Sequence, residues 1–158
     1  MATIKPCLWF DDQGEEAARF YTSVLPNSRI SGVQTYGDAG PGRPGSAMVV
    51  EFVLDGAEFM ALNGGPAPYG FTEAVSFYRE CATQDEVDAL WAALTEGGEA
   101  SQCGWLKDRY GVSWQIVPRA LREMLLDPDP AKANAVMQAM LKMQKIETQE
   151  LRDAYDAA

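Results

Sequence analysis

Glu51 is the residue whose surroundings best suit acid–base chemistry, because it interrupts an apolar run. Residues 48–54 and 57–63 have strand-like patterns and flank Asp55-Gly56, a pair typical of a two-residue type I′ hairpin. That turn predicts that Glu51 faces Met60 and shares one side of the hairpin with apolar neighbours. We expect the carboxylate to be partly desolvated there, as suits a general base. The alternative is that it points to solvent or pairs with an arginine. The candidate arginines are Arg29, Arg79 and Arg109.

The sequence contains no histidine. Ser–His–Asp and Cys–His catalysis, imidazole general bases and histidine-ligated zinc or iron are therefore excluded. The three cysteines, Cys7, Cys81 and Cys103, are far apart in the sequence and form no CxxC pair. We expect them to be reduced and packed as small apolar residues.

A literal GxGxxG pattern runs from Gly40 to Gly45. A dinucleotide site needs a strand before this pattern, a helix after it and free backbone N–H groups. Here Pro41 and Pro44 remove two of those donors, and a strand-like run follows. We interpret the segment as a loop without a nucleotide.

Acidic residues outnumber basic ones, 23 to 13, which gives a net charge of -10. This balance argues against binding to nucleic acid or to an anionic membrane surface, since both need clustered cations. No apolar run approaches the roughly 20 residues that span a bilayer, and the first residues lack the apolar core of a signal peptide. The expected location is the cytoplasm.

Two similar sets of strands and helices are expected to position the candidate residues. In the first half, a strand at 4–10 precedes a helix that begins at a capping box of Asp12 and Glu15 and stops at Pro26-Asn27. A strand at 28–36 and the hairpin follow it.

The second half repeats this order with a strand at 74–82, a capping box of Thr83 and Glu86, and a helix that ends at Gly97-Gly98. A second hairpin follows, with strands at 99–107 and 111–117. Two βαβββ units emerge, and each needs a partner to bury its sheet.

The sequence thus predicts an α+β fold in which residues 1–66 and 67–118 are paired βαβββ modules and residues 119–158 are a helical extension. The extension has a short helix at 120–126, a break at 127–130 and a helix at 131–145. We expect the second helix to dock on its own domain or on a second subunit. Its apolar stripe consists of Val136, Met137, Met140, Leu141 and Gln144.

Several runs together resemble a known family: KPCLWF, EEAARFY with LPNSRI, EFVLDGAEFMALNGGP, CGWLKDRYGVSWQIVP, and DPDPAKA with VMQAMLKMQKIE. They are similar to the PhnB-like branch of the vicinal oxygen chelate superfamily, the glyoxalase/bleomycin resistance/dioxygenase fold. Many of its members carry the label 3-demethylubiquinone-9 3-methyltransferase domain. The resemblance implies paired modules that form an eight-stranded cup-shaped mixed sheet, commonly in a homodimer.

The resemblance also indicates where metal-dependent members hold a divalent ion. The corresponding positions here are Pro6, Met60, Ser76 and Gln115, with Gln115 where a glutamate ligand would lie. Proline, methionine and serine are poor ligands for a catalytic divalent metal, so we expect neither metal nor cofactor. The only glycine-rich run that could serve an S-adenosylmethionine enzyme is the proline-containing loop already excluded.

Three functions stay open. The first is a metal-free protein that binds a small apolar or aromatic molecule in the cup, and the second is a small-molecule enzyme (an isomerase, a lyase or the labelled methyltransferase) with Glu51 as base. The third is a dimeric interaction protein. The expected ligand-binding residues are Gln115, Ser76, Met60, Leu8, Trp105 and Asn63.

Overall fold

The computed structural model describes residues 4–158. The chain forms two compact units, residues 1–70 and 71–158. The division lies between residues 70 and 71, close to the predicted module boundary at residues 66 and 67, and the helical extension belongs to the second unit. In residues 4–158 no helix is both long and apolar enough to cross a bilayer.

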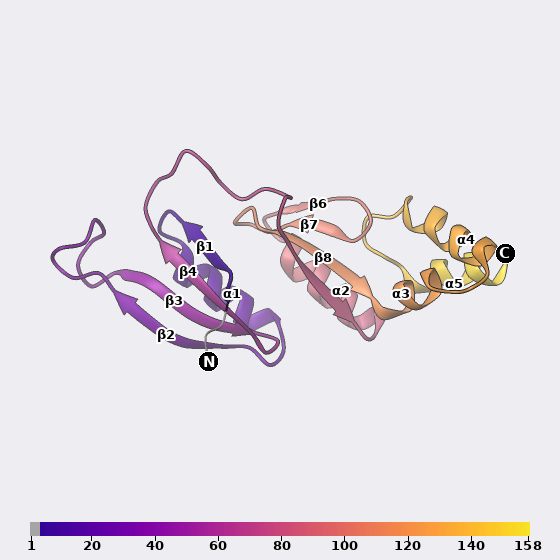
Figure 1. The fold of residues 1–158 in the computed structure, drawn as a ribbon, viewed down its shortest axis with the longest axis horizontal. Coiled ribbons are helices and arrows are strands. Elements are labelled where there is room, and N and C mark those ends of the chain that lie inside the picture. Colours follow the sequence, from indigo (N-terminus) through magenta and orange to yellow (C-terminus); the bar gives the residue numbers. More distant parts are fainter. Residues whose placement is uncertain (1–3) are drawn as a thin grey trace. The chain divides into compact units, whose positions relative to one another are not determined.

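The first unit is a βαβββ module (Figure 1). Its sheet has the strand order β1-β4-β3-β2, in which β1 and β4 run parallel and the other pairs antiparallel. The helix packs on one face of the sheet and leaves the opposite face open within this unit. The elements are β1 (Cys7–Phe10), α1 (Gly14–Val24), β2 (Arg29–Thr35), β3 (Ala47–Leu54) and β4 (Ala57–Asn63).

The second unit repeats this module and adds three helices (Figure 1). Its sheet order, β5-β8-β7-β6, matches that of the first unit strand for strand, with β5 and β8 parallel. The predicted α+β class and the two βαβββ modules are therefore confirmed. The elements are β5 (Ser76–Cys81), α2 (Gln84–Thr95), β6 (Glu99–Ala100), β7 (Trp105–Lys107), β8 (Ser113–Pro118), α3 (Arg119–Leu125), α4 (Pro130–Met140) and α5 (Thr148–Asp156).

The β3–β4 hairpin has the predicted register. Asp55 and Gly56 both have positive φ, 46° and 85°, as a type I′ turn requires. Glu51 pairs with Met60, and Phe52 pairs with Phe59. Phe52 and its same-face neighbours Val50 and Ala61 are buried on the side that α1 covers.

The predicted Asp12–Glu15 capping box is wrong, because α1 begins at Gly14 and the side chain of the residue before it forms no capping hydrogen bond. Instead, Asn63 Oδ1 at the end of β4 accepts a hydrogen bond of 2.7 Å from Gly14 N. In the second predicted capping box, the Thr83 cap is confirmed, since Thr83 Oγ1 accepts from Glu86 N at 3.2 Å. The Glu86 carboxylate accepts from Ala82 N rather than from Thr83 N.

The strand predicted at 99–107 is interrupted, and the helix predicted at 131–145 ends early, at Met140. The two irregular segments contact each other through their backbones. Cys103 and Gly104 take positive φ values, and their N–H groups donate to the carbonyls of Met143 and Gln144 at 2.8 and 2.7 Å. These hydrogen bonds join two irregular segments that are distant in the sequence.

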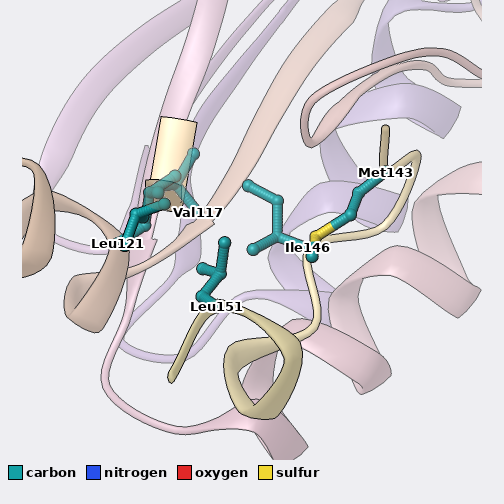
Figure 2. Close-up of a cluster of buried hydrophobic side chains, with 6 residues drawn as sticks. Val117, Leu121, Met143, Ile146 and Leu151 are labelled. Carbon is teal, nitrogen blue, oxygen red and sulfur yellow. The ribbon is translucent and has the colours of Figure 1, made fainter. Parts of the chain in front are cut away.

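The helices of the extension pack on their own unit around an apolar cluster. Figure 2 shows side chains of this cluster, which come from the end of β8, from α3–α5 and from the segment that precedes α5. Of the predicted stripe, Val136 is buried in the cluster, whereas Met137 and Leu141 are exposed. The cluster consists of Val117, Leu121, Val136, Met143, Ile146 and Leu151.

Candidate functional site

The sheet of the second unit presents one face away from α2, here called the open face. Gln115 on β8 pairs with Tyr78 on β5 and with Trp105 on β7, so these three side chains share that face. Ser76 lies two residues before Tyr78, and its Oγ accepts a hydrogen bond of 2.9 Å from Gln115 Nε2. Three of the predicted ligand-binding residues, Ser76, Trp105 and Gln115, therefore lie together.

Two cavities flank Trp105 on the open face. The first has a volume of about 450 Å³, and the second, at the side of the C-terminal helices, has about 420 Å³. Trp105 and Cys103 line both, and Gln115 lines the second. Each volume falls within the range typical of small-molecule pockets.

One residue that lines the first cavity has a buried polar atom without a partner. Ser113 is 1% exposed, and its Oγ has no hydrogen-bond partner among the described residues. A buried hydroxyl in this state is uncommon and costs free energy until a partner satisfies it. Sequence reasoning missed Ser113, although the alternation of β8 places it two residues before Gln115 on the same face.

An ion pair borders the first cavity. Lys107 Nζ lies 2.6 Å from Glu73 Oε1. This hydrogen bond lowers the pKa of the Glu73 carboxyl and raises the pKa of the Lys107 ammonium, so both groups are charged at neutral pH.

The second cavity is lined mainly by apolar side chains. Tyr78 contributes its ring, and partial burial raises the pKa of its phenol, a shift that the nearby charge of Glu80 supports and that of Arg122 opposes. The hydroxyl is therefore a neutral donor at physiological pH. Tyr78 and Arg122 are further residues that the sequence analysis did not single out.

The three cysteines are free thiols. Cys81 lies on the α2 side of the sheet, where burial raises the pKa of its thiol to about 11. It is therefore protonated and unreactive at neutral pH. Cys103 is the cysteine that lines the cavities.

In the first unit, Glu51 and Met60 lie side by side on the face away from α1. The Glu51 side chain is 43% exposed, and its carboxylate lies 3.5 Å from Lys5 Nζ. The ion partner is Lys5 rather than one of the three arginines considered. The role of Glu51 as a general base stays a prediction.

Two other predicted ligand-binding residues serve the interior of the first unit. Leu8 pairs with Ala61 and is 8% exposed, so it lies on the α1 side, opposite to Met60. Asn63 is also buried, and its Nδ2 donates to Ala47 O at 3.0 Å while its Oδ1 caps Gly14 N. Both polar atoms of the Asn63 side chain thus bind the backbone of its own unit.

The GxGxxG segment borders a third cavity, of about 710 Å³, in the first unit. Gly40 and Gly42 pack against the ring of Tyr36, and a Cβ atom on Gly42 would come within 2.2 Å of that ring. The glycines therefore permit close packing on an aromatic side chain. The segment is a loop followed by strand β3, as predicted.

The sequence profile of a family described as 3-demethylubiquinone-9 3-methyltransferase matches residues 2–117. The chain belongs to this family. The resemblance inferred from the sequence motifs is thereby confirmed. No functionally curated protein shows significant similarity to the chain.

Solved structures support the assignment. A putative 3-demethylubiquinone-9 3-methyltransferase, a PhnB protein from Bacillus cereus, is 34% identical, with a TM-score of 0.69, over 74% of this chain and 99% of its own. A protein from Pseudomonas aeruginosa is 22% identical, with a TM-score of 0.62, and the match covers 75% of this chain and 98% of that protein. A fosfomycin resistance protein from Listeria monocytogenes is 13% identical, with a TM-score of 0.54, and the match covers 80% of this chain and 98% of that protein. The last two likenesses show the shared fold.

Proposed function

We propose that this family member binds a small apolar or aromatic molecule on the open face of its second sheet, without a metal ion. The observation that carries the proposal is the pair of cavities on either side of Trp105. Large aromatic side chains supply much of the contact area in ligand sites, and a few convergent polar groups fix orientation.

The polar groups needed for orientation are present. Ser113 Oγ offers a buried hydroxyl without a partner at the first cavity. Gln115 donates one amide hydrogen to Ser76, and its Oε1 is a further acceptor beside the second cavity. A ligand that supplies the missing hydrogen bond to Ser113 recovers the cost of burying that hydroxyl.

The donor atoms support a site without a metal. The positions that the resemblance assigns to metal ligands carry, in the first unit, a proline and a thioether (Pro6, Met60) and, in the second, the hydrogen-bonded pair Ser76 and Gln115. Divalent metals of catalytic sites prefer imidazole and carboxylate ligands. In residues 4–158 no group of three or more histidine, cysteine, aspartate or glutamate side chains is arranged to hold an ion.

The proposal is tested with N-phenyl-1-naphthylamine, a neutral aromatic dye whose fluorescence rises in apolar surroundings. We expect saturable binding to the full chain that is unchanged by a chelator. Trp105→Leu should weaken binding at least about tenfold, because it removes a large part of the aromatic contact surface.

Trp91→Leu is the matched control, because Trp91 lies on α2 and lines neither cavity. Equal affinities of the two variants, loss of binding on chelation, or a stoichiometric metal in the purified protein would each contradict the proposal.

A further inference from the structure

The C-terminal helices form one wall of the second cavity. The family match ends at residue 117, and α3–α5 lie beyond it. Tyr78, Trp105 and Gln115 line the cavity from the sheet, and α3 and α4 contribute further side chains. The residues from the extension are Leu121, Arg122, Leu125, Leu126 and Met140.

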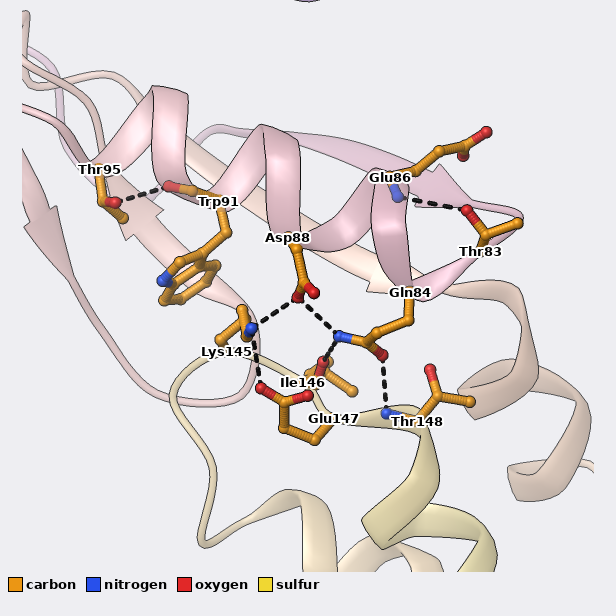
Figure 3. Close-up of polar contacts among 10 residues, drawn as sticks. All are labelled: Thr83, Gln84, Glu86, Asp88, Trp91, Thr95, Lys145, Ile146, Glu147 and Thr148. Carbon is orange, nitrogen blue, oxygen red and sulfur yellow. Dashed lines mark hydrogen bonds and ion pairs between the residues drawn. The ribbon is translucent and has the colours of Figure 1, made fainter.

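This wall is fixed in place by polar contacts with α2. Gln84 Nε2 donates to Ile146 O at 3.0 Å, and Thr148 N donates to Gln84 Oε1 at 2.9 Å (Figure 3). Lys145 Nζ lies 2.6 Å from Asp88 Oδ1. With the apolar cluster of Figure 2, these contacts hold the extension against the module.

The wall combines apolar surface with one uncompensated cation. Leu126 is 71% exposed although it lines the cavity, so its apolar surface is available to a ligand. Arg122, four residues earlier, forms no ion pair with any carboxylate in residues 4–158, whereas Arg119 on the same helix pairs with Glu80 at 3.0 Å. In a chain of net charge -10, an unpaired guanidinium beside an apolar cavity selects for negative charge.

We infer that the second cavity takes a small amphipathic anion, with its aromatic or alkyl body between Trp105 and Leu126 and its carboxylate or sulfonate at Arg122. The inference rests on the proposed function and extends it, because it assigns the selectivity to the extension rather than to the family's own module. Arg122 and Leu126 are then the residues that determine specificity.

The test compares two dyes with similar aromatic bodies. 8-Anilinonaphthalene-1-sulfonate carries a negative charge, and N-phenyl-1-naphthylamine is neutral. In the full chain, Arg122→Gln should weaken binding of the sulfonate about tenfold and change binding of the neutral dye less than about twofold, because a charge-assisted hydrogen bond is lost only for the anion. Leu126→Asp should weaken the anionic dye more than about tenfold by adding like charge and removing apolar surface.

Two controls match these changes. Arg152→Gln removes the same charge from α5, and Leu141→Asp alters an exposed leucine of the extension, 58% exposed, that does not line this cavity. Both controls should bind the sulfonate like the unmodified protein. Circular dichroism of all four variants checks that the fold is kept.

The results separate the inference from the proposed function. If Arg122→Gln leaves the sulfonate affinity unchanged, or Leu141→Asp acts as strongly as Leu126→Asp, the inference is wrong while binding of the neutral dye still supports the proposed function. If neither dye binds, both the inference and the proposed function fail.

Discussion

Replacing Gln84 with alanine should loosen the C-terminal extension without unfolding the module. Gln84 forms two partly buried hydrogen bonds to the backbone of the extension, at Ile146 and Thr148. A hydrogen bond of this kind contributes about 1 kcal/mol net, so the loss of both amounts to about 2 kcal/mol. The apolar cluster and the Lys145–Asp88 pair still hold the docked state in the variant.

A loss of about 2 kcal/mol raises the population of locally opened molecules about 30-fold. Amide hydrogen exchange, read by mass spectrometry on peptides from residues 141–158, measures that population. Peptides from β8 and from the first unit should exchange at their original rates, because the change is local.

Gln149→Ala is the matched control. Gln149 forms an exposed hydrogen bond to Asp153 within α5, which is worth about 0.5 kcal/mol or less and predicts roughly a twofold effect. If Gln84→Ala accelerates exchange in the extension no more than Gln149→Ala does, Gln84 does not anchor the extension and the reasoning is refuted.

Two other changes test the polar contacts. Asn63→Ala should destabilise the first unit by about 3 kcal/mol in urea unfolding, because Gly14 N and Ala47 O lose their partner at a buried position. Asn63→Asp keeps the acceptor for Gly14 N and should cost less. Equal stability of the unmodified protein and both variants would contradict the capping role. Hydrogen bonds from Lys145 and Gln84 hold the pKa of Asp88 below its ordinary value of 3.8, so the stabilisation is present above that value and is lost as the pH falls through the lowered one. Asp88→Asn should therefore lower the free energy of unfolding by about 0.5 kcal/mol at neutral pH, a figure discounted because the carboxylate is about half exposed. The difference between the two proteins should close as the pH falls below the ordinary pKa of the aspartate; a difference that is constant with pH would contradict this.

Local sequence signals sufficed where a turn determines the structure by itself. Asp55-Gly56 favours positive φ at both positions, and this fixes the pairing of Glu51 with Met60. The same reasoning correctly placed Thr83 at the start of α2. The repeated strand–helix–strand order then gave the fold of both modules.

Predictions failed where residues distant in the sequence meet. The face on which Leu8 lies depends on the parallel register of β1 with β4, which no turn specifies. The start of α1 depends on Asn63, 49 positions away from Gly14. Neither relation leaves a pattern in a short window of sequence.

The same contrast between local signals and contacts of distant residues applies to the candidate site. The resemblance to the family placed Gln115 and Ser76 on the same part of the fold, and the two side chains are hydrogen bonded to each other. The unpartnered Ser113 and the contribution of Arg122 became visible only in three dimensions, because each depends on what the rest of the unit does or does not place nearby.

The backbone hydrogen bonds from Cys103 and Gly104 to the extension have a practical consequence for anyone who shortens the chain to the part that matches its relatives. Truncation after residue 117 removes the acceptors of two backbone N–H groups, those of Cys103 and Gly104, and exposes the apolar side chain of Val117 on β8. The exposed apolar surface makes such a fragment prone to aggregation during purification. A shortened chain should therefore keep α3–α5 together with the module.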